Sequence, residues 1–251
     1  MILHKFYNKP YYKMTSFHGG KQRIGKQLSE VIVKKSIDIS EKDKFEIKGY
    51  CEPFCGMLGV YQHIPEFFNN PDLVYKAGDI NKSVIMMWQD NKLPSSTITT
   101  QEEFMKLKYD GETSAHKGFV GHFYGYSGQY FQPFKNREST TLKNTITKIE
   151  QIKKKVHNVS FSSGSYTQYS TLKNYVIYCD PPYQVQSNYY DENRKRLSFD
   201  HDKFWDWCRF MSIDNIVFVS EYNLPEDFEK IYSIASRTGG SPKVDNLYML
   251  N

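Results

Sequence analysis

The run YVIYC at residues 175–179 constrains the fold most, because Asp180, Pro181 and Pro182 follow it at once. Consecutive apolar, aromatic and β-branched residues are typical of a strand buried on both faces of a parallel sheet. Proline has no N–H group and a fixed φ, so two successive prolines end the strand. The sequence therefore predicts a buried parallel strand that carries an acid at its carboxyl end.

Other segments alternate between strand and helix patterns. Strands are expected at residues 47–54, 73–78 and 216–219, and helices at residues 22–35, 59–68, 82–91, 140–155 and 201–210. This alternation is typical of βαβ units in a doubly wound α/β fold. A chain of 251 residues can form one such domain with an elaboration.

The elaboration is expected at residues 91–156, where the alternation breaks. Ten lysines and Arg137 stand against six acids there, and this excess accounts for the whole formal charge of +5. Local positive charge is common on a solvated surface, but it is also the footprint of a phosphate-binding surface. Glycines alternate with aromatic residues at positions 118–134. That pattern favours either a tight β-hairpin or rings that stack on bases.

Composition argues against several classes of protein. No apolar run approaches the roughly 20 residues that span a bilayer, and the first residues lack the apolar centre of a signal peptide, so we expect a cytoplasmic protein. The four cysteines have no CxxC spacing, which favours reduced, mostly buried thiols over disulfides or zinc. Motifs of zinc deaminases and HExxH proteases are missing, and no metal is expected.

The tetrapeptide Asp180-Pro181-Pro182-Tyr183 carries the groups that an aromatic amine needs. Ligands of open α/β sheets bind beyond the carboxyl ends of the strands. An exocyclic amine needs two acceptors for its two hydrogens and a flat partner for its ring. The Asp180 carboxylate and the Pro181 carbonyl can supply the acceptors, and the Tyr183 ring can supply the flat partner.

Three further segments lie at strand ends or helix starts. In CEPFCGMLG at residues 51–59, Gly56 and Gly59 permit a ligand to approach the backbone closely. Asp79 follows the next strand, where it can accept the hydroxyls of a ribose or cap the following helix. The segment FHGGK at residues 17–21 places Lys21 before a helix, where it can meet a carboxylate.

In their order along the chain, the segment at residues 17–21, the segment at residues 51–59, Asp79, the inserted region and the tetrapeptide at residues 180–183 resemble the D12 class of DNA adenine methyltransferases, from about residue 17 to residue 248. The resemblance implies a Rossmann-like, S-adenosylmethionine-dependent methyltransferase domain at residues 1–90 and 157–251, with an inserted target-recognition region at residues 91–156. It implies direct methyl transfer to N6 of an adenine that is flipped out of duplex DNA. The catalytic residues would be Asp180, Pro181, Pro182 and Tyr183.

The same resemblance assigns the cofactor pocket. Phe17, His18 and Lys21 would touch the methionine part of S-adenosylmethionine, and Asp79 would hold its ribose. The remaining contacts would come from Pro53, Phe54, Cys55, Gly56, Leu58, Ile80 and Asp180. Residues 160–169 resemble the family's next cofactor strand, but Ser165, followed by Tyr166, stands where the family usually has an acid. Residues 219–222 resemble a segment that helps to wall the target pocket.

The basic region supplies the candidates for DNA binding. Lys143, Lys148 and Lys153 are expected to contact phosphates, and Gln129 and Arg137 to contact base edges. Residues 118–131 look more like viral and phage members of the family than like its GATC-type enzymes. A viral or phage protein would act in the cytoplasm of its host. A cognate restriction endonuclease, and the choice between monomer and homodimer, stay open.

The same residues bear on four other functions. N4-cytosine methylation also modifies an exocyclic amine, but that group prefers Ser at the position of Asp180. A cofactor-dependent DNA-binding protein without turnover is a second alternative, against which the intact Asp79 and Asp180 argue. RNA adenine methylation is disfavoured by the order of the motifs. C5-cytosine methylation is excluded, because none of the cysteines follows a proline as its nucleophile would.

Overall fold

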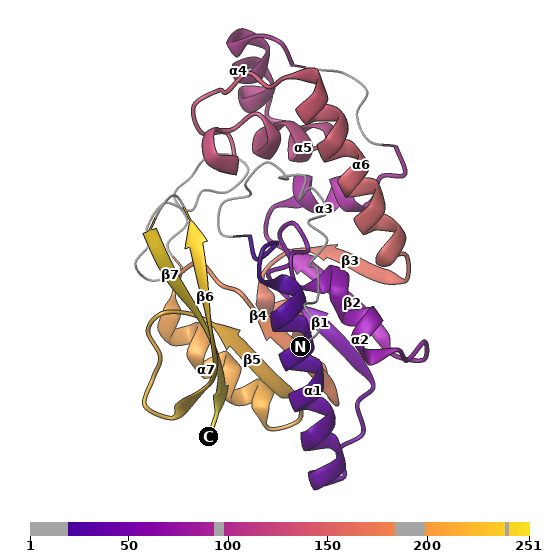
Figure 1. Ribbon diagram of the computed structural model, residues 1–251, viewed down its shortest axis with the longest axis vertical. Helices are drawn as coiled ribbons and strands as arrows, with labels where there is room; N and C mark the ends of the chain where they lie inside the picture. Colours follow the sequence, from indigo (N-terminus) through magenta and orange to yellow (C-terminus); the bar gives the residue numbers. More distant parts are fainter. Residues whose placement is uncertain (1–19, 93–97, 184–198, 239–240) are drawn as a thin grey trace, which may run out of the picture.

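The computed structural model of the chain describes residues 20–92, 98–183, 199–238 and 241–251, and Figure 1 shows the arrangement of its elements. The helices are α1 (Gly25–Asp43), η1 (Tyr61–His63), α2 (Ile64–Phe68), α3 (Lys82–Gln89), α4 (Gln101–Tyr109), α5 (Ala115–Phe123), η2 (Tyr126–Gly128), α6 (Ser139–Lys155), η3 (Tyr166–Tyr169) and α7 (His201–Ser212). The strands are β1 (Gly49–Glu52), β2 (Val74–Asp79), β3 (Val159–Ser163), β4 (Tyr175–Cys179), β5 (Ile216–Ser220), β6 (Phe228–Thr238) and β7 (Ser241–Leu250).

The strands form a seven-stranded sheet in the order β3-β2-β1-β4-β5-β7-β6. Neighbouring strands from β3 to β5 are parallel, whereas β7 is antiparallel to both β5 and β6. The strand order reverses between β1 and β4, which pair directly. Ligands of open α/β sheets bind at the carboxyl ends of the strands on either side of such a reversal. A ligand-binding site is therefore expected at the residues that follow β1 and β4.

Alternate residues of the central strands pack on opposite faces of the sheet. Tyr178 and Phe218 belong to the core that includes residues of α1, α2, α3 and α6. Ile177 and Val217, one position earlier on the same strands, belong to the second core, which α7 covers with Phe204, Trp205, Trp207, Cys208 and Met211. Both sets are buried because side chains alternate along a strand and helices cover both faces.

Most of the expected elements are confirmed, and their ends differ by a few residues. Strand β4 has the expected bounds. Strand β3 covers residues 159–163, so it begins one residue before the segment 160–169 and covers only its first part. Helices α6 and α7 begin and end within two residues of their expected bounds. Helix α1 starts three residues later than expected and continues to Asp43. The long antiparallel pair β6 and β7 was not anticipated, because much of its surface is exposed and it lacks a continuous apolar run.

The expectation of a β-hairpin in the glycine-rich region is wrong for residues 115–123, which form helix α5. Two glycines of this helix permit close packing. A Cβ at Gly118 would collide with the backbone carbonyl of Ser83 at the start of α3, and a Cβ at Gly121 would collide with the ring of Tyr130. An isolated antiparallel bridge between Gly125 and Phe134 closes the segment that follows the helix.

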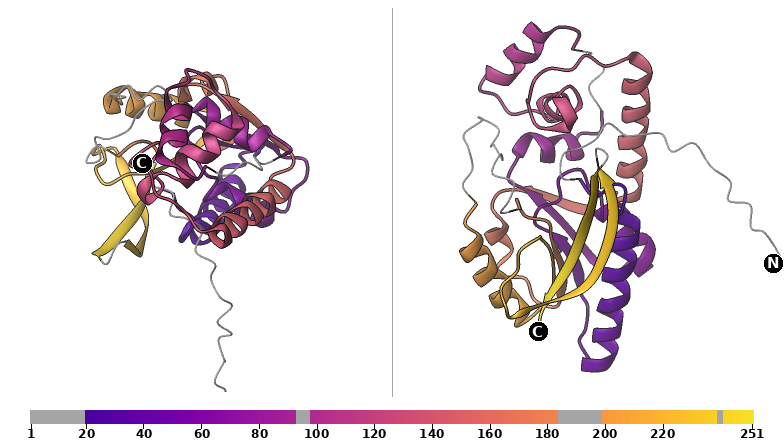
Figure 2. Two further views of the ribbon diagram at one scale, coloured as in Figure 1. Left: turned by 90° about the horizontal axis from the view of Figure 1, so that it is seen from above. Right: turned by 60° about the vertical axis from the view of Figure 1, so that its left-hand side comes forward.

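Residues 98–155 lie beyond the carboxyl edge of the sheet. Figure 1 shows α4 and α5 above the strands, with α6 descending beside the sheet toward β3, and Figure 2 shows the same arrangement from two other directions. The ammonium of Lys153 in α6 donates to the carbonyl of Asp90 after α3, and Lys155 lies 3.9 Å from Glu66 in α2. Helix α6 is thereby joined to the part of the chain that carries β1 and β2.

The four cysteines are buried and free, as expected. In the part of the chain that the structure describes, no helix is both long enough and apolar enough to cross a bilayer. Among the same residues, no group of three or more His, Cys, Asp or Glu side chains is arranged to hold a metal ion.

Candidate active site

Asp180 and Tyr183 meet the same side chain, Lys21, at the carboxyl end of β4. The Lys21 ammonium donates to Asp180 Oδ1 at 2.9 Å and to the Tyr183 hydroxyl at 2.6 Å. It also lies 4.8 Å from the centre of the Tyr183 ring. The sequence places Lys21 before α1, more than 150 residues from Asp180, so the fold alone brings Lys21 and the segment 180–183 together. All three side chains are largely buried.

Burial and charge act against each other in this cluster. Burial raises the pKa of the Asp180 carboxyl, and the charge and hydrogen bond of Lys21 oppose that rise. Burial alone would lower the pKa of Lys21, but the nearby charges of Asp180 and Asp245 outweigh it and raise the pKa above its usual range. Lys21 is therefore held as a cation beside the acid of the tetrapeptide.

Residues of α7 and of the segment after β5 also contact the tetrapeptide at residues 180–183. His201 Nε2, in the first turn of α7, is 2.8 Å from the Pro182 carbonyl, a hydrogen bond in which the ring N–H donates. The Tyr222 ring packs edge-on against Tyr183, with centroids 4.7 Å apart and an interplanar angle of 78°. Of residues 219–222, expected to wall the target pocket, Tyr222 thus lies against Tyr183. That role remains a proposal.

The turn after β1 packs backbone to backbone on the start of α1. A Cβ at Gly59 would lie 3.0 Å from backbone atoms of Lys21 and Gln22, and a Cβ at Gly25 would collide with the Gly59 carbonyl. Two glycines are needed here because the two segments approach too closely for side chains. The Gln22 amide also donates to the carbonyl of Met57 at 3.2 Å. This packing fixes Lys21 relative to residues 53–58.

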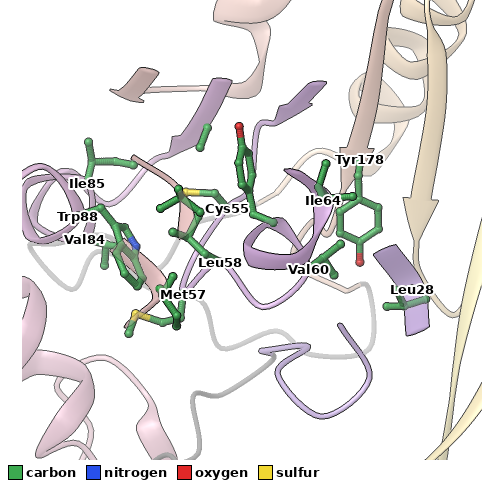
Figure 3. Packing of buried hydrophobic residues seen from close by; sticks show 14 of the residues in the cluster. Leu28, Cys55, Met57, Leu58, Val60, Ile64, Val84, Ile85, Trp88 and Tyr178 are labelled. Carbon is green, nitrogen blue, oxygen red and sulfur yellow. The ribbon is translucent and has the colours of Figure 1, made fainter. Parts of the chain in front are cut away.

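The same turn has left-handed backbone at Gly56 and Leu58, with φ of 44° and 55°. Its shape is held from α3, because the Trp88 indole donates to the Gly56 carbonyl at 2.8 Å. Figure 3 shows Met57 and Leu58 among the buried side chains of α3, including Trp88. Trp88 has no counterpart among the expected site residues, and nothing in its local sequence points to this contact.

Asp79, at the end of β2, uses both of its oxygens on backbone N–H groups. Oδ2 accepts from Gly56 at 3.0 Å and Oδ1 accepts from Asn81 at 2.8 Å. Burial raises the pKa of this carboxyl, and the two N–H groups oppose the rise. The alternative that Asp79 caps the next helix is wrong, since the N-cap of α3 is Asn81, whose side chain accepts from Val84. Each Asp79 oxygen retains a second lone pair for a ligand hydroxyl.

Phe54 and Tyr166 stack on one another with ring centres 5.5 Å apart. Both rings also pack against Phe204 of α7, so they form the rim of the second core. Ser165 is exposed and caps η3 through a bond from the Thr167 N–H, and Ile80 is exposed. A partly buried aromatic stack beside a strand end offers a surface on which a purine ring can lie.

Of the remaining residues that were expected to bind the cofactor, two are described by the structure and two are not. Pro53 and Cys55 are buried in the turn after β1, where the Cys55 N–H donates to the Gly78 carbonyl at 2.7 Å. Phe17 and His18 lie outside the described residues. The turn at Gly56, the Asp79 carboxylate and the stacked rings lie at the ends of β1, β2 and β3, and together they fit an adenosine, with an acceptor for hydroxyls and an aromatic face for the base.

The candidates for DNA binding are not equivalent in the structure. Lys143 is exposed on α6, whereas Lys153 is half-buried on the Asp90 carbonyl. Burial and the nearby Lys155 lower the pKa of Lys148. Arg137 Nε donates to the Phe123 carbonyl at 3.0 Å, so this guanidinium holds the end of α5. Gln129 is partly exposed beside η2.

Two acids at the site were missed in the sequence. Glu52, at the end of β1, is buried and accepts from the Tyr50 hydroxyl at 2.7 Å, and burial raises the pKa of this carboxyl well above its usual range. Asp245 of β7 lies 3.6 Å from the Lys21 ammonium. Glu52 could have been noticed as an acid inside an apolar run, but Asp245 stands in a polar segment without any motif.

An open α/β sheet that carries a glycine turn, an acid and Asp-Pro-Pro-Tyr at its carboxyl edge is the arrangement expected from the resemblance to S-adenosylmethionine-dependent methyltransferases. The model of the D12 class N6 adenine-specific DNA methyltransferase family matches residues 115–239. The chain belongs to this family. The matched segment includes Asp180 and Tyr183, whereas Lys21, Gly56 and Asp79 precede it.

Other comparisons are weaker. TrmN from Thermus thermophilus superposes with a TM-score of 0.37 at 9% identity, over 86% of this chain and 48% of that chain, so this chain spans about half of its length. Magnesium protoporphyrin IX methyltransferase (ChlM) from Synechocystis PCC 6803 superposes with a TM-score of 0.36 at 9% identity, over 98% of this chain and 86% of that chain. These scores are low, and the family assignment rests on the family model alone. No curated protein sequence matches the chain.

Proposed function

We propose that the chain methylates N6 of an adenine at a specific site in duplex DNA, after the base is rotated out of the helix to lie beside Tyr183. The observation that carries this proposal is the grouping of Asp180, the Pro181 carbonyl and the Tyr183 ring at the carboxyl end of β4. An amine on a flat ring needs these groups, namely two acceptors and an aromatic face.

The proposed reaction is a direct transfer. When bound, S-adenosylmethionine supplies an electrophilic methyl group on a sulfonium sulfur. Asp180 and the Pro181 carbonyl accept the two amine hydrogens, which aligns the nitrogen lone pair with the methyl carbon and stabilises the positive charge that nitrogen develops. The nitrogen–carbon bond forms as the carbon–sulfur bond breaks, and the additional proton on nitrogen passes to solvent.

The cofactor is proposed to lie along the ends of β1, β2 and β3. Asp79 would accept from the ribose hydroxyls, the backbone at residues 53–58 would line the methionine part, and Tyr166 with Phe54 would face the adenine. Family members usually have an acid where this chain has Ser165. Recognition of the cofactor's adenine would therefore depend here on stacking and on the Ser165 hydroxyl. Lys21 is instead engaged with Asp180, which makes its proposed contact to the methionine part dependent on a change of partner.

DNA is proposed to bind across the helices α4 to α6 and the adjoining site. The support is the excess of positive charge at residues 91–156 and the position of these helices beyond the carboxyl edge of the sheet. Exposed lysines such as Lys143 suit phosphate contacts. Gln129 and Arg137 keep the proposed role in base recognition, with Arg137 using N–H groups beyond those that hold α5.

Radiolabelled methyl transfer tests the proposal. Purified protein is incubated with methyl-labelled S-adenosylmethionine and unmethylated duplex DNA, the product is hydrolysed to nucleosides, and methylated positions are mapped. Label in N6-methyladenine at one sequence supports the proposal. Label in N4-methylcytosine, or transfer to RNA alone, would replace it with the corresponding alternative. Tight cofactor and DNA binding with no transfer would indicate a binding protein.

A further inference from the structure

Lys21 and Asp180 form a contact that conflicts with the proposed function. The amine of the target base requires the Asp180 carboxylate, but Asp180 Oδ1 already accepts from the Lys21 ammonium at 2.9 Å. A lysine that keeps this bond takes up one acceptor site of the carboxylate, and its positive charge opposes the positive charge that the amine nitrogen develops during transfer. Removing a buried ammonium from its carboxylate without a substitute would be costly. A carboxylate of the protein that holds Lys21 would leave more of the Asp180 charge to the base, whether or not the methionine part of the cofactor also contacts the ammonium.

Asp245 is placed to be that anion. Its Oδ1 lies 3.6 Å from the Lys21 ammonium, whereas a charge-assisted hydrogen bond is formed at about 2.7–2.9 Å, so a shift of under about 1 Å completes it. The Tyr183 hydroxyl, 2.6 Å from the same ammonium, can remain a partner throughout. An ammonium has three N–H donors and can pass between the acceptors without being left unpaired.

Asp245 lies on a different part of the sheet from the tetrapeptide at residues 180–183. It lies on β7, which is antiparallel to β5 and β6, and pairs there with Ile234 of β6. Its side chain is 13% exposed, compared with 17% for Asp180 and 7% for Lys21, so both carboxylates act on the cation from a water-poor environment. In such an environment the attraction between charges is stronger than in bulk water.

We propose that Asp245 is a positioning residue, which draws the Lys21 ammonium away from Asp180 when the target amine enters and so frees Asp180 to accept from that amine. The inference rests on the proposed function, because it requires a base with an exocyclic amine in the pocket. Asp245 touches neither the base nor the cofactor in this proposal, and it acts only through Lys21.

The test compares target bases with and without the amine. Wild type and Asp245→Asn are titrated, in the presence of S-adenosylhomocysteine, with duplexes that carry either adenine or unsubstituted purine at the mapped target position. Wild type should prefer the adenine duplex. In Asp245→Asn this preference should fall about 10- to 100-fold, the scale of a hydrogen bond to a charged group. The rate of a single turnover should fall similarly, while S-adenosylmethionine affinity and the melting temperature stay close to wild type.

Two further variants separate positioning from structure. Asp245→Glu keeps the charge and should restore part of the preference. In a Lys21→Met background, Asp245→Asn should have no additional effect on the preference, because the lysine through which it acts is gone. Asn246→Ala is the matched control, since this neighbour on β7 bonds Ser233 on the exposed side of the hairpin. It should leave the preference unchanged.

The outcomes are distinguishable. If Asp245→Asn weakens adenine and purine duplexes equally, or is active with an unchanged preference, the inference is overturned while the proposed function stands. If Asp245→Asn does not fold, the preference of Asp245→Glu and of the Lys21→Met pair decides in the same way. If the wild type transfers no methyl group to any adenine, the proposed function fails and the inference fails with it.

Discussion

The Asp79 carboxylate at the end of β2 accepts from the backbone N–H of Gly56 at 3.0 Å, and so ties the turn after β1 to the neighbouring strand end. A group proposed to bind the ribose is therefore also a brace for the loop that lines the pocket. The other Asp79 oxygen is bound to the Asn81 N–H. Ligand binding and loop shape are coupled through one side chain.

Asp79→Ala is expected to weaken S-adenosylmethionine binding by about 1.5 to 3 kcal/mol, the scale of hydrogen bonds to a charged group. Isothermal titration calorimetry measures it. Asn81→Ala is the control, because it removes the cap of α3 and should cost about 1 kcal/mol of stability without a comparable loss of affinity. Unchanged affinity in Asp79→Ala would restrict Asp79 to bracing the backbone.

Asp180→Ala is expected to reduce methyl transfer by roughly 10² to 10³ or more, because it removes the acceptor that orients the amine. Cofactor binding should survive, since most of the proposed pocket lies at the ends of other strands. Single-turnover rates and calorimetry on the same preparation give both values. A rate within tenfold of wild type would exclude Asp180 as the orienting acceptor.

Tyr183→Ala should be severely impaired and Tyr183→Phe much less so, because the proposed use of this residue is its ring face. The structure adds a smaller cost for Tyr183→Phe, since the hydroxyl accepts from Lys21 at 2.6 Å. Transfer rates at saturating DNA check the order of the two variants. Equal losses would mean that the hydroxyl, and not the ring, matters.

Lys143→Ala and Lys153→Ala are expected to differ, although both residues lie on α6. Lys143 is exposed, and its loss should lower the slope of log affinity against log salt by about one if it contacts a phosphate. Lys153 is bound to the Asp90 carbonyl, so its replacement should instead lower stability by about 1 kcal/mol. Salt titrations of DNA binding and thermal melts on both variants are the measurements. Identical behaviour would contradict the assignment.

Stability should fall as the solution becomes acidic. Burial lowers the pKa of His122 and of His63 from 6.5 to about 4, so the unfolded chain binds protons that the folded chain does not. This contribution to stability is complete above pH 6.5 and is lost as the pH falls toward 4. In His122→Asn, melts between pH 7 and pH 4.5 should show a smaller loss than in wild type. His157→Asn, at an exposed position, should behave as wild type.

The sequence by itself determined the central parallel strands of the sheet and the centre of the proposed site. The run at residues 175–179 forms β4 with the expected bounds, because a short run of consecutive apolar residues is by itself enough to predict a buried strand. The two prolines after it end the strand, so Asp180 and Tyr183 had to lie at its carboxyl end. These features depend on near neighbours in the chain.

Only the tertiary structure decided which charges meet. Lys21 reaches Asp180 and Asp245 because α1 packs on the Gly59 turn and β7 returns beside β5, and no local pattern encodes either event. The glycines at residues 118–121 were ambiguous for a similar reason. A missing side chain permits a hairpin and a close helix contact equally well, and the partner helix α3 determined which of them forms.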